Sequence, residues 1–272
     1  MHMTVIVDNR STGEVEGEWG LCIYIEYKGR NILLDSGGSE LFFDNCKKLG
    51  KKIEDVDIAV LSHAHYDHGN GFPLFLEKNK TARLYVQESC RDNCYALEDG
   101  EMEYIGLPEG MLSKYKDRIE RVDSITEIAD GVYIVPHIID REQRLKVGER
   151  EQMFIKNGEK YDIDDFSHEQ SLVFECADEL VVFNSCCHIG ADRVISEIKE
   201  TFEGKKIKAL IGGFHLYNKT SDEVRNFAKR VEDTKIEYIC TGHCTGEKAY
   251  TILKDVLGEK LHHLKVGLEV DF

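Results

Sequence analysis

The segment LSHAHYDHGNGF, residues 61–72, holds four potential metal ligands close together: His63, His65, Asp67 and His68. It follows the apolar stretch VDIAV, which is typical of a buried strand. His63 and His65 are two positions apart, so on an extended chain their side chains project to the same side. Imidazole nitrogens and carboxylate oxygens suit Zn²⁺, Fe or Mn. Because one loop rarely gives one ion four ligands, the spacing predicts one or two metal ions.

Three more histidines follow apolar stretches in the C-terminal half. They are His188 in FNSCCHIG, His215 in LIGGFHLY and His243 in CTGHCTG, and each lies within two residues of a glycine. A single histidine at a strand end is more often structural than a ligand, but three in the same topological place favour a shared site. We expect them to converge with the first cluster at one edge of a sheet.

The elements that must position these residues alternate between strands and helices. Strands are expected at about 3–9, 20–29, 30–38, 57–62, 82–87, 171–176, 180–188, 206–215 and 235–244, and helices at 39–50, 71–78, 191–204, 221–234 and 246–258. Ser39 is expected to cap the first helix and Gly50 to end it. Thr220 and Glu223 have the spacing of a capping box. Hairpins followed by βαβ units indicate an α/β fold with two sheets between helix layers, an αββα sandwich.

The stretch from about 91 to 168 is polar and irregular around one clear strand at 131–138. Within a single domain spanning 1–272, such a stretch is expected to be a lid or insertion over the site. His168 and Glu169, at its end, are candidate substrate-binding residues of this lid. The alternative is that they belong to an ordinary solvated loop.

Composition limits the function further. The chain has 272 residues, 42% hydrophobic residues and a net charge of −16, which disfavours nucleic acid as a partner. No long apolar stretch or export signal is present, so we expect no membrane partner and a cytoplasmic location. The nine cysteines indicate reduced thiols, mostly small buried hydrophobes, although a soft-metal role for Cys186, Cys187 or Cys244 stays open. Homo-oligomerisation also stays open.

These motifs resemble the metallo-β-lactamase superfamily. LLDSGG with Asp35 is similar to its first motif and HAHYDH to its H-x-H-x-D-H motif. LSHAHYDHGNG, DDFSHEQSLVFE, CCHIGADRV, IGGFHL and HCTG, in this order, resemble the group named for dihydropterin ribofuranosylaminobenzene 5'-phosphate synthase. The resemblance runs from about Val5 to Phe272 and implies the αββα fold.

The resemblance also implies roles for individual residues. It implies a first ligand set of His63, His65 and His188, and a second of Asp67, His68 and His243. Asp35 would orient a ligand histidine, and Asp67 would also take part in catalysis. The bridging aspartate of the superfamily is missing, because the corresponding strand ends in IGGFH. His215 is then either a replacement ligand or a catalytic donor to a substrate oxyanion or leaving phosphate, and we favour the donor.

The implied activity is metal-dependent catalysis on a small, phosphate-bearing substrate. Divalent ions, Zn²⁺ above Fe, Mn or Mg²⁺, would support hydrolysis of an ester, lactone or phosphoester. The subgroup instead implies a transfer in which a pterin methylene loses pyrophosphate. The alternatives are a phosphodiester or lactone hydrolase unrelated to pterins, a redox metalloprotein, and a binding protein with a degenerate site. A diiron redox centre is disfavoured because His65 stands where those proteins resemble H-x-E-x-D.

Overall fold

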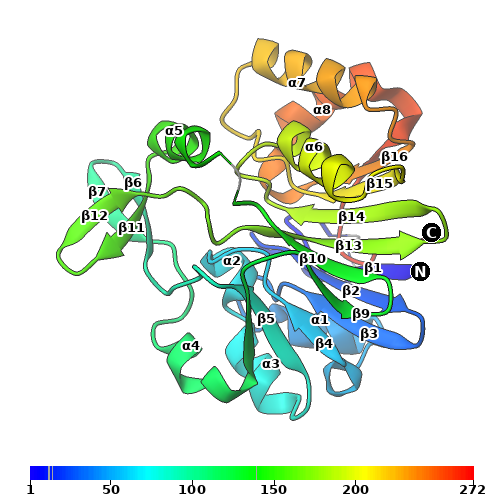
Figure 1. The fold of residues 1–272 in the computed structure, drawn as a ribbon. Helices are drawn as coiled ribbons and strands as arrows, with labels where there is room; N and C mark the ends of the chain where they lie inside the picture. Colours follow the sequence, from blue (N-terminus) through cyan, green and yellow to red (C-terminus); the bar gives the residue numbers. More distant parts are fainter. Residues whose placement is uncertain (12, 14, 139) are drawn as a thin grey trace.

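The structure is a computed structural model, and it describes residues 1–11, 13, 15–138 and 140–272. Two seven-stranded sheets stack on each other, and helices cover both outer faces (Figure 1). The expected αββα sandwich is therefore confirmed. Both chain ends lie on the same side of the molecule, near β1 and β13.

The first sheet has the strand order β18-β1-β2-β3-β4-β5-β8. Its strands are β1 His2–Val7, β2 Cys22–Tyr27, β3 Arg30–Leu34, β4 Ile58–Val60, β5 Arg83–Gln87, β8 Ile119–Val122 and β18 Glu269–Asp271. Pairing is antiparallel from β18 to β3 and parallel from β3 to β8. The parallel half places the carboxyl ends of β3, β4 and β5 at one edge of the sheet.

The second sheet has the order β17-β16-β15-β14-β13-β10-β9. Its strands are β9 Thr126–Ala129, β10 Val132–Pro136, β13 Gln170–Cys176, β14 Glu179–Ser185, β15 Lys206–Gly212, β16 Tyr238–Thr241 and β17 Leu261–His263. Strands β14 to β17 are parallel, and β9, β10, β13 and β14 are antiparallel. The carboxyl ends of β14, β15 and β16 therefore also share one edge.

Helices cover the outer face of each sheet. The α-helices are α1 Leu41–Lys48, α2 Tyr66–Gly69, α3 Phe72–Lys78, α4 Met111–Lys114, α5 Arg141–Glu151, α6 Ala191–Thr201, α7 Ser221–Asp233 and α8 Glu247–Leu257. The 3₁₀ turns are η1 Ile53–Asp55, η2 Lys116–Arg118, η3 His243–Thr245 and η4 Gly258–Lys260. Helices α1 and α3 pack on the first sheet, and α6, α7 and α8 pack on the second.

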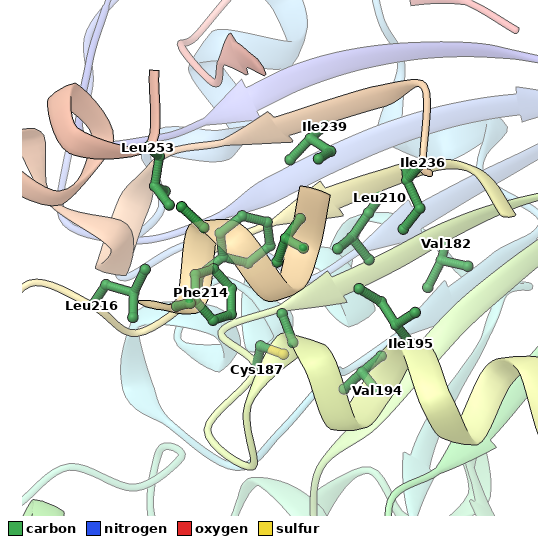
Figure 2. Packing of buried hydrophobic residues seen from close by; sticks show 14 of the residues in the cluster. Val182, Cys187, Val194, Ile195, Leu210, Phe214, Leu216, Ile236, Ile239 and Leu253 are labelled. Carbon is green, nitrogen blue, oxygen red and sulfur yellow. The ribbon is translucent and has the colours of Figure 1, made fainter. Parts of the chain in front are cut away.

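The core follows from the alternation of side chains along the strands. In β14, Leu180 and Val182 pack against the helix layer, whereas Val181 and Phe183 lie between the two sheets. Figure 2 shows Val182 on the sheet facing Ile195 of α6. Because both faces of β14 are apolar, this strand is a continuous hydrophobic stretch, as expected for a strand buried on both sides.

The stretch from about 91 to 168 is not irregular, which corrects the expectation from the sequence. It contributes β8, β9 and β10 to the main sheets and forms a third sheet, β12-β11-β6-β7. The strands of this small sheet are β6 Cys94–Glu98, β7 Glu101–Tyr104, β11 Met153–Asn157 and β12 Lys160–Ile163. They are short and mostly half-exposed, so their many polar residues give no clear alternation of apolar and polar positions, which is the sequence signal of a strand.

Local signals at the helix ends are confirmed in two of three cases. Thr220 and Glu223 form the expected capping box of α7. Gly50 follows α1 in the left-handed conformation, at φ 70°, where glycine is favoured. Ser39 is not the N-cap of α1, because the helix begins one residue later than expected, after Glu40. Among the described residues, no helix combines the length and apolar character needed to cross a membrane.

Candidate metal centre

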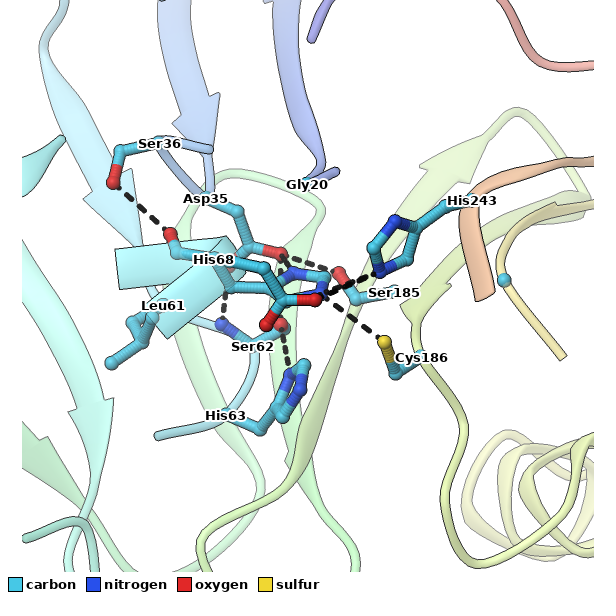
Figure 3. Close-up of polar contacts among 12 residues, drawn as sticks. Gly20, Asp35, Ser36, Leu61, Ser62, His63, His68, Ser185, Cys186 and His243 are labelled. Atoms are coloured by element: carbon cyan, nitrogen blue, oxygen red, sulfur yellow. Dashed lines mark hydrogen bonds and ion pairs between the residues drawn. The ribbon is translucent and has the colours of Figure 1, made fainter. Parts of the chain in front are cut away.

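The candidate ligands lie just beyond the carboxyl ends of neighbouring parallel strands. Residues 63–68 follow β4, which ends at Val60, and the C-terminal histidines follow β14, β15 and β16. All six candidate ligands are buried: His63, His65, Asp67, His68, His188 and His243. The two sheets thus deliver polar side chains from distant parts of the sequence to one edge of the sandwich (Figure 3).

The first cluster consists of His63, His65 and His188. Each offers a nitrogen within 4.8 Å of the other two. The ring centroids are 4.6 to 5.0 Å apart. The Nε2 atoms of His63 and His65 and both ring nitrogens of His188 are buried without a hydrogen-bond partner among the described residues. Buried nitrogens of this kind need a partner, and a metal ion is one that satisfies all three rings.

The second cluster consists of Asp67, His68 and His243. His68 donates from Nδ1 to Asp35 Oδ2 at 2.7 Å, and His243 donates from Nδ1 to Asn9 Oδ1 at 3.1 Å. In the neutral rings, the two Nε2 lone pairs then face each other at 3.2 Å. Two lone pairs at this distance repel unless a proton or a cation lies between them.

The separations in the second cluster match those of ligands around one tetrahedral ion. Asp67 Oδ2 lies 3.3 Å from His243 Nε2 and 3.8 Å from His68 Nε2. Nitrogen ligands bound to Zn²⁺ at about 2.05 Å stand about 3.3 Å apart in tetrahedral geometry. The three atoms therefore fit a divalent cation without rearrangement of the chain.

Electrostatics prepares the first cluster to bind a cation. Burial, together with the neighbouring histidines, lowers the pKa of His63 and of His188 well below the usual value. Burial likewise lowers the pKa of His65 to about 3. All three rings are therefore neutral at pH 7 and keep a lone pair for a metal ion.

In the second cluster, the surroundings favour positive charge instead of neutral rings. Burial disfavours a charge on His68, but Asp67 and Asp35 outweigh it and raise the pKa of His68 to about 9. Burial also disfavours the Asp67 carboxylate, yet the attraction of the neighbouring His68 and His243 rings holds its pKa below the usual value. The position between these side chains is therefore one where positive charge is favourable.

Asp35 connects both clusters to the first sheet. Its Oδ1 accepts from Ser62 N at 2.7 Å, and its Oδ2 accepts from Ser62 Oγ, His68 Nδ1 and Ser185 Oγ at 2.8, 2.7 and 2.7 Å (Figure 3). Because Ser62 Oγ donates to Asp35, it accepts from His63 Nδ1 at 2.9 Å, which leaves His63 Nε2 free. One carboxylate thus sets the orientation of two candidate ligand histidines.

Several residues of the site adopt a backbone conformation that non-glycine residues rarely take. They are Asp35, Ser185, Cys187, His215 and His243, with φ values from 47° to 62°. Each costs on the order of 1 kcal/mol. Such strain persists where the surrounding structure fixes it, and it gathers at functional sites.

Cys186 is the residue of the site that sequence reasoning undervalued. Its Sγ lies 3.1 Å from His68 Nε2, and it also groups with His63, His188 and His243 in clusters whose ligand atoms lie within 4.8 Å of one another. The only sequence signal was its position two residues before His188.

His168 and Glu169 lie in the centre, but their contacts differ from the substrate-binding role expected for them. His168 Nδ1 accepts from Ala64 N at 3.1 Å, and its Nε2 donates to Asp164 Oδ2 at 3.0 Å. Glu169 accepts from the backbone of His188 at 2.8 Å. Both side chains are 4% exposed or less. They hold the two ligand loops, and these buried partners leave them little access to a substrate.

His215 lies at the border between the metal centre and a cavity. Its ring centroid is 4.3 Å from that of His188, and its Nε2 is 3.5 Å from Glu151 Oε2. Burial disfavours a charge on His215, but the nearby Cys244 and Glu151 side chains outweigh it and raise its pKa to about 9. Glu151 is also paired with Lys219. A protonated His215 is therefore held against the first ligand cluster.

The cavity has a volume of about 980 Å³ and reaches His188 and His215. Its basic lining residues are Lys146, Arg150, Arg193, Lys199, Lys219 and Arg230. These six outnumber the five carboxylates of the lining, although the whole chain carries a charge of −16. The cavity is thus a place in this acidic protein that is suited to an anion.

Two exposed aromatic side chains flank the centre. Trp19 is 45% exposed, and its ring lies 5.2 Å from that of His243. Tyr217 is 50% exposed and lies 5.2 Å from the His215 ring and 6.1 Å from Trp19. Both aromatic side chains are accessible from solvent beside candidate functional histidines.

An αββα sandwich with a buried histidine-rich cluster at one sheet edge defines the metallo-β-lactamase fold class. Residues 19–154 match the family described as the metallo-beta-lactamase superfamily, and the chain belongs to this superfamily. The resemblance seen in the sequence motifs is therefore confirmed. Proteins of this fold bind divalent metals, in keeping with the clusters found here.

One protein of similar sequence and two solved structures of the same fold resemble this chain over nearly its whole length. The chain is 26% identical to the 7,8-dihydropterin-6-methyl-4-(beta-D-ribofuranosyl)-aminobenzene-5'-phosphate synthase of Methanocaldococcus jannaschii, over 93% of this chain and 90% of that protein. It superimposes on the crystal structure of Tm1679, a metal-dependent hydrolase of the beta-lactamase superfamily, with a TM-score of 0.85, 28% identity and coverage of 100% and 99%. Zn²⁺-bound PqqB from Methylobacterium extorquens shares the fold, with a TM-score of 0.57, 12% identity and full coverage of both chains. The chain is an enzyme, a hydrolase or a transferase.

Proposed function

We propose that this enzyme holds two divalent ions, Zn²⁺ above others, and acts on a small substrate that carries a phosphate group. His63, His65 and His188 would bind the first ion, and Asp67, His68 and His243 the second. The observation that carries the proposal is the 3.2 Å separation of His68 Nε2 and His243 Nε2, each with its Nδ1 hydrogen already donated.

Such ions supply Lewis-acid activation of the electrophile and of water at neutral pH. The chain's own residues do the remaining work. Asp35 fixes the rings of His68 and, through Ser62, of His63. Protonated His215, held by Glu151, donates a hydrogen bond to the oxyanion or leaving phosphate and can transfer its proton there.

The phosphate would lie in the cavity beside His215. Lys219 lines this cavity and reaches Glu151, the partner of His215. A phosphate group favours several basic side chains around it, because each adds a charge-assisted hydrogen bond. The excess of basic lining residues in an acidic chain supports this location.

An aromatic part of the substrate would stack on Trp19 and Tyr217. Their exposed rings stand beside His243 and His215, within reach of a group bound at the metals. A flat ring gains about 1 kcal/mol from such a contact beyond the area it buries. The name of the Methanocaldococcus jannaschii relative includes a pterin and an aminobenzene ring, which agrees with this arrangement.

Two reaction types remain candidates, each favoured by a relative. Similarity to a named synthase favours transfer, and similarity to a metal-dependent hydrolase favours hydrolysis. The test is a turnover screen of zinc-loaded protein on pterin diphosphates with an aminobenzene acceptor, on phosphodiesters and on lactones. Turnover that needs the acceptor establishes transfer, and turnover without it establishes hydrolysis. If zinc-loaded protein turns over none of them, the proposed substrate class is wrong.

We further propose that part of the stretch from about 91 to 168 covers the site. Cys94 of β6 lies 3.8 Å from His168, and His65 forms a bridge with Gly106. Glu151, at the end of α5, contacts His215. The contacts come from the small third sheet, its adjoining loop and α5, while β8, β9 and β10 serve the main sheets.

A further inference from the structure

We propose that the Cys186 thiolate is a ligand shared by both metal positions, in place of the bridging carboxylate that this chain lacks. The inference rests on the proposed metal centre and deepens it. It assigns one further side chain to the centre and narrows the choice of metal.

The position of Cys186 supports a shared ligand. Its Sγ lies 3.1 Å from His68 Nε2, a residue of the second ligand set. It also lies within 4.8 Å of a ligand nitrogen of His63 and of His188, both from the first set. A further cluster joins it to His243 on the other side. Cys186 therefore stands between the two sets, and Figure 3 shows its sulfur directed toward His68 and His243.

The surroundings of Cys186 distinguish it from an ordinary buried cysteine. Cys187, the next residue, packs in the apolar core with Val194 and Phe214, as seen in Figure 2. Cys186 is equally buried, at 3% exposed, yet among the described residues it belongs to none of the three apolar clusters. A cysteine kept as a small hydrophobe would contact apolar side chains, whereas Cys186 contacts imidazoles.

The backbone is built to direct Cys186 into the centre. Ser185, with φ 51°, turns the chain at the end of β14, and its hydroxyl is tied to Asp35 Oδ2 at 2.7 Å. Gly212 lets β15 approach this turn, since a Cβ at Gly212 would lie 2.7 Å from Ser185 N. Asp35 thereby orients His68 and the turn before Cys186 together.

A second, independent observation points to a ligand at this place. His63 Nε2 and both ring nitrogens of His188 are fully buried without a partner among the described residues, and all of them belong to clusters that contain Cys186 or adjoin it. A thiolate sulfur has several lone pairs and can bind two ions at about 2.3 Å each. On binding, the thiol loses its proton to solvent, so no redox step is involved.

A thiolate ligand makes the centre selective. Thiolate and imidazole suit Zn²⁺ and Co²⁺, whereas Mg²⁺ prefers oxygen ligands. We therefore expect Mg²⁺ not to compete for the centre at concentrations at which Zn²⁺ or Co²⁺ fills it.

Cobalt substitution tests the assignment, because a thiolate bound to Co²⁺ gives a charge-transfer absorption in the near ultraviolet that imidazole and carboxylate ligands do not give. We expect this band in the wild type and in Cys187→Ser, the matched control, and its loss in Cys186→Ser. Cys186→Asp should bind both ions without the band, because it restores a carboxylate bridge. Loss of one of the two ions is expected in Cys186→Ser.

The outcomes separate this inference from the proposed function. A wild-type protein that binds two Co²⁺ ions without the band, or a band that persists in Cys186→Ser, would show that Cys186 is not a ligand while the metal centre stands. A wild-type protein that binds no metal would overturn both. If Cys186→Ser does not fold, X-ray absorption of the zinc-loaded wild type decides: sulfur in the metal shell of the wild type and of Cys187→Ser supports the assignment, and its absence refutes it.

Discussion

Replacing Asp35 by Asn tests whether this carboxylate holds the metal centre together. The substitution keeps the size of the side chain but replaces one acceptor oxygen by an amide that donates. Oδ2 accepts three hydrogen bonds, from Ser62, His68 and Ser185, and Oδ1 accepts one, from Ser62 N. In either orientation of the amide, one oxygen position can no longer accept.

The expected loss of zinc affinity in Asp35→Asn follows from these contacts. A hydrogen bond to a charged group contributes about 2 kcal/mol, which corresponds to about 30-fold in a binding constant. Because Asn is uncharged, the bond that fixes the His68 ring loses its charge assistance in either orientation of the amide, and zinc binding should weaken by up to about 30-fold, within the range seen when residues behind metal ligands are changed. The assay is competition for zinc against a chelator of known affinity.

Asp44→Asn is the matched control, because Asp44 is an exposed carboxylate of α1 whose charged partner is Lys47 at 3.5 Å. It should bind zinc as the wild type does, and circular dichroism should show that both variants are folded. Wild-type zinc affinity in a folded Asp35→Asn would refute the role given to this carboxylate.

Four further predictions follow from the same geometry. His63→Ala should lose metal and activity together, and full metal content in this variant would contradict its assignment as a ligand. His215→Ala should keep its metal while turnover falls by about 10²- to 10⁴-fold; loss of a metal equivalent would make His215 a ligand, and unchanged turnover would make it structural. Trp19→Ala should raise KM for an aromatic substrate about fivefold with metal content unchanged, and an unchanged KM would exclude stacking. In chelator-treated protein, unfolding in urea should show that the wild type loses about 2 kcal/mol more stability than His65→Asn between pH 7.5 and pH 5. Here the unfolded state takes up a proton near pH 6.5, while buried His65 stays neutral down to a pKa of about 3; equal losses would contradict this.

The sequence predicted those parts of the site that depend on residues close together in the chain or on the ends of neighbouring strands. His63 and His65 lie in the loop after β4, and Asp67 and His68 lie in the short helix α2 that follows, so the proximity of the four residues needs no tertiary information. The C-terminal histidines were also predictable, because parallel strands end at a common edge. The capping box at Thr220 is a local signal of the same kind.

The parts that could not be predicted depend on contacts between distant residues. Asn9 fixes His243 from 234 positions away, and Ser185 reaches Asp35 across 150 positions. The direction of the Cys186 side chain is set by the left-handed conformation of Ser185. This conformation could not be predicted from the sequence, because the residue is a serine and not a glycine. The third sheet was missed because its strands are short and half-exposed, so their polar residues gave no clear alternation.

Metal analysis of protein purified without chelator tests whether the two clusters hold metal ions. We predict two equivalents of zinc per wild-type chain, and one equivalent in His243→Ala, which removes a ligand of the second set only. His263→Ala is the matched control, since His263 lies in β17 outside both clusters. It should keep both equivalents. A wild-type protein without stoichiometric metal, or a His243→Ala variant that retains both ions, would contradict the account.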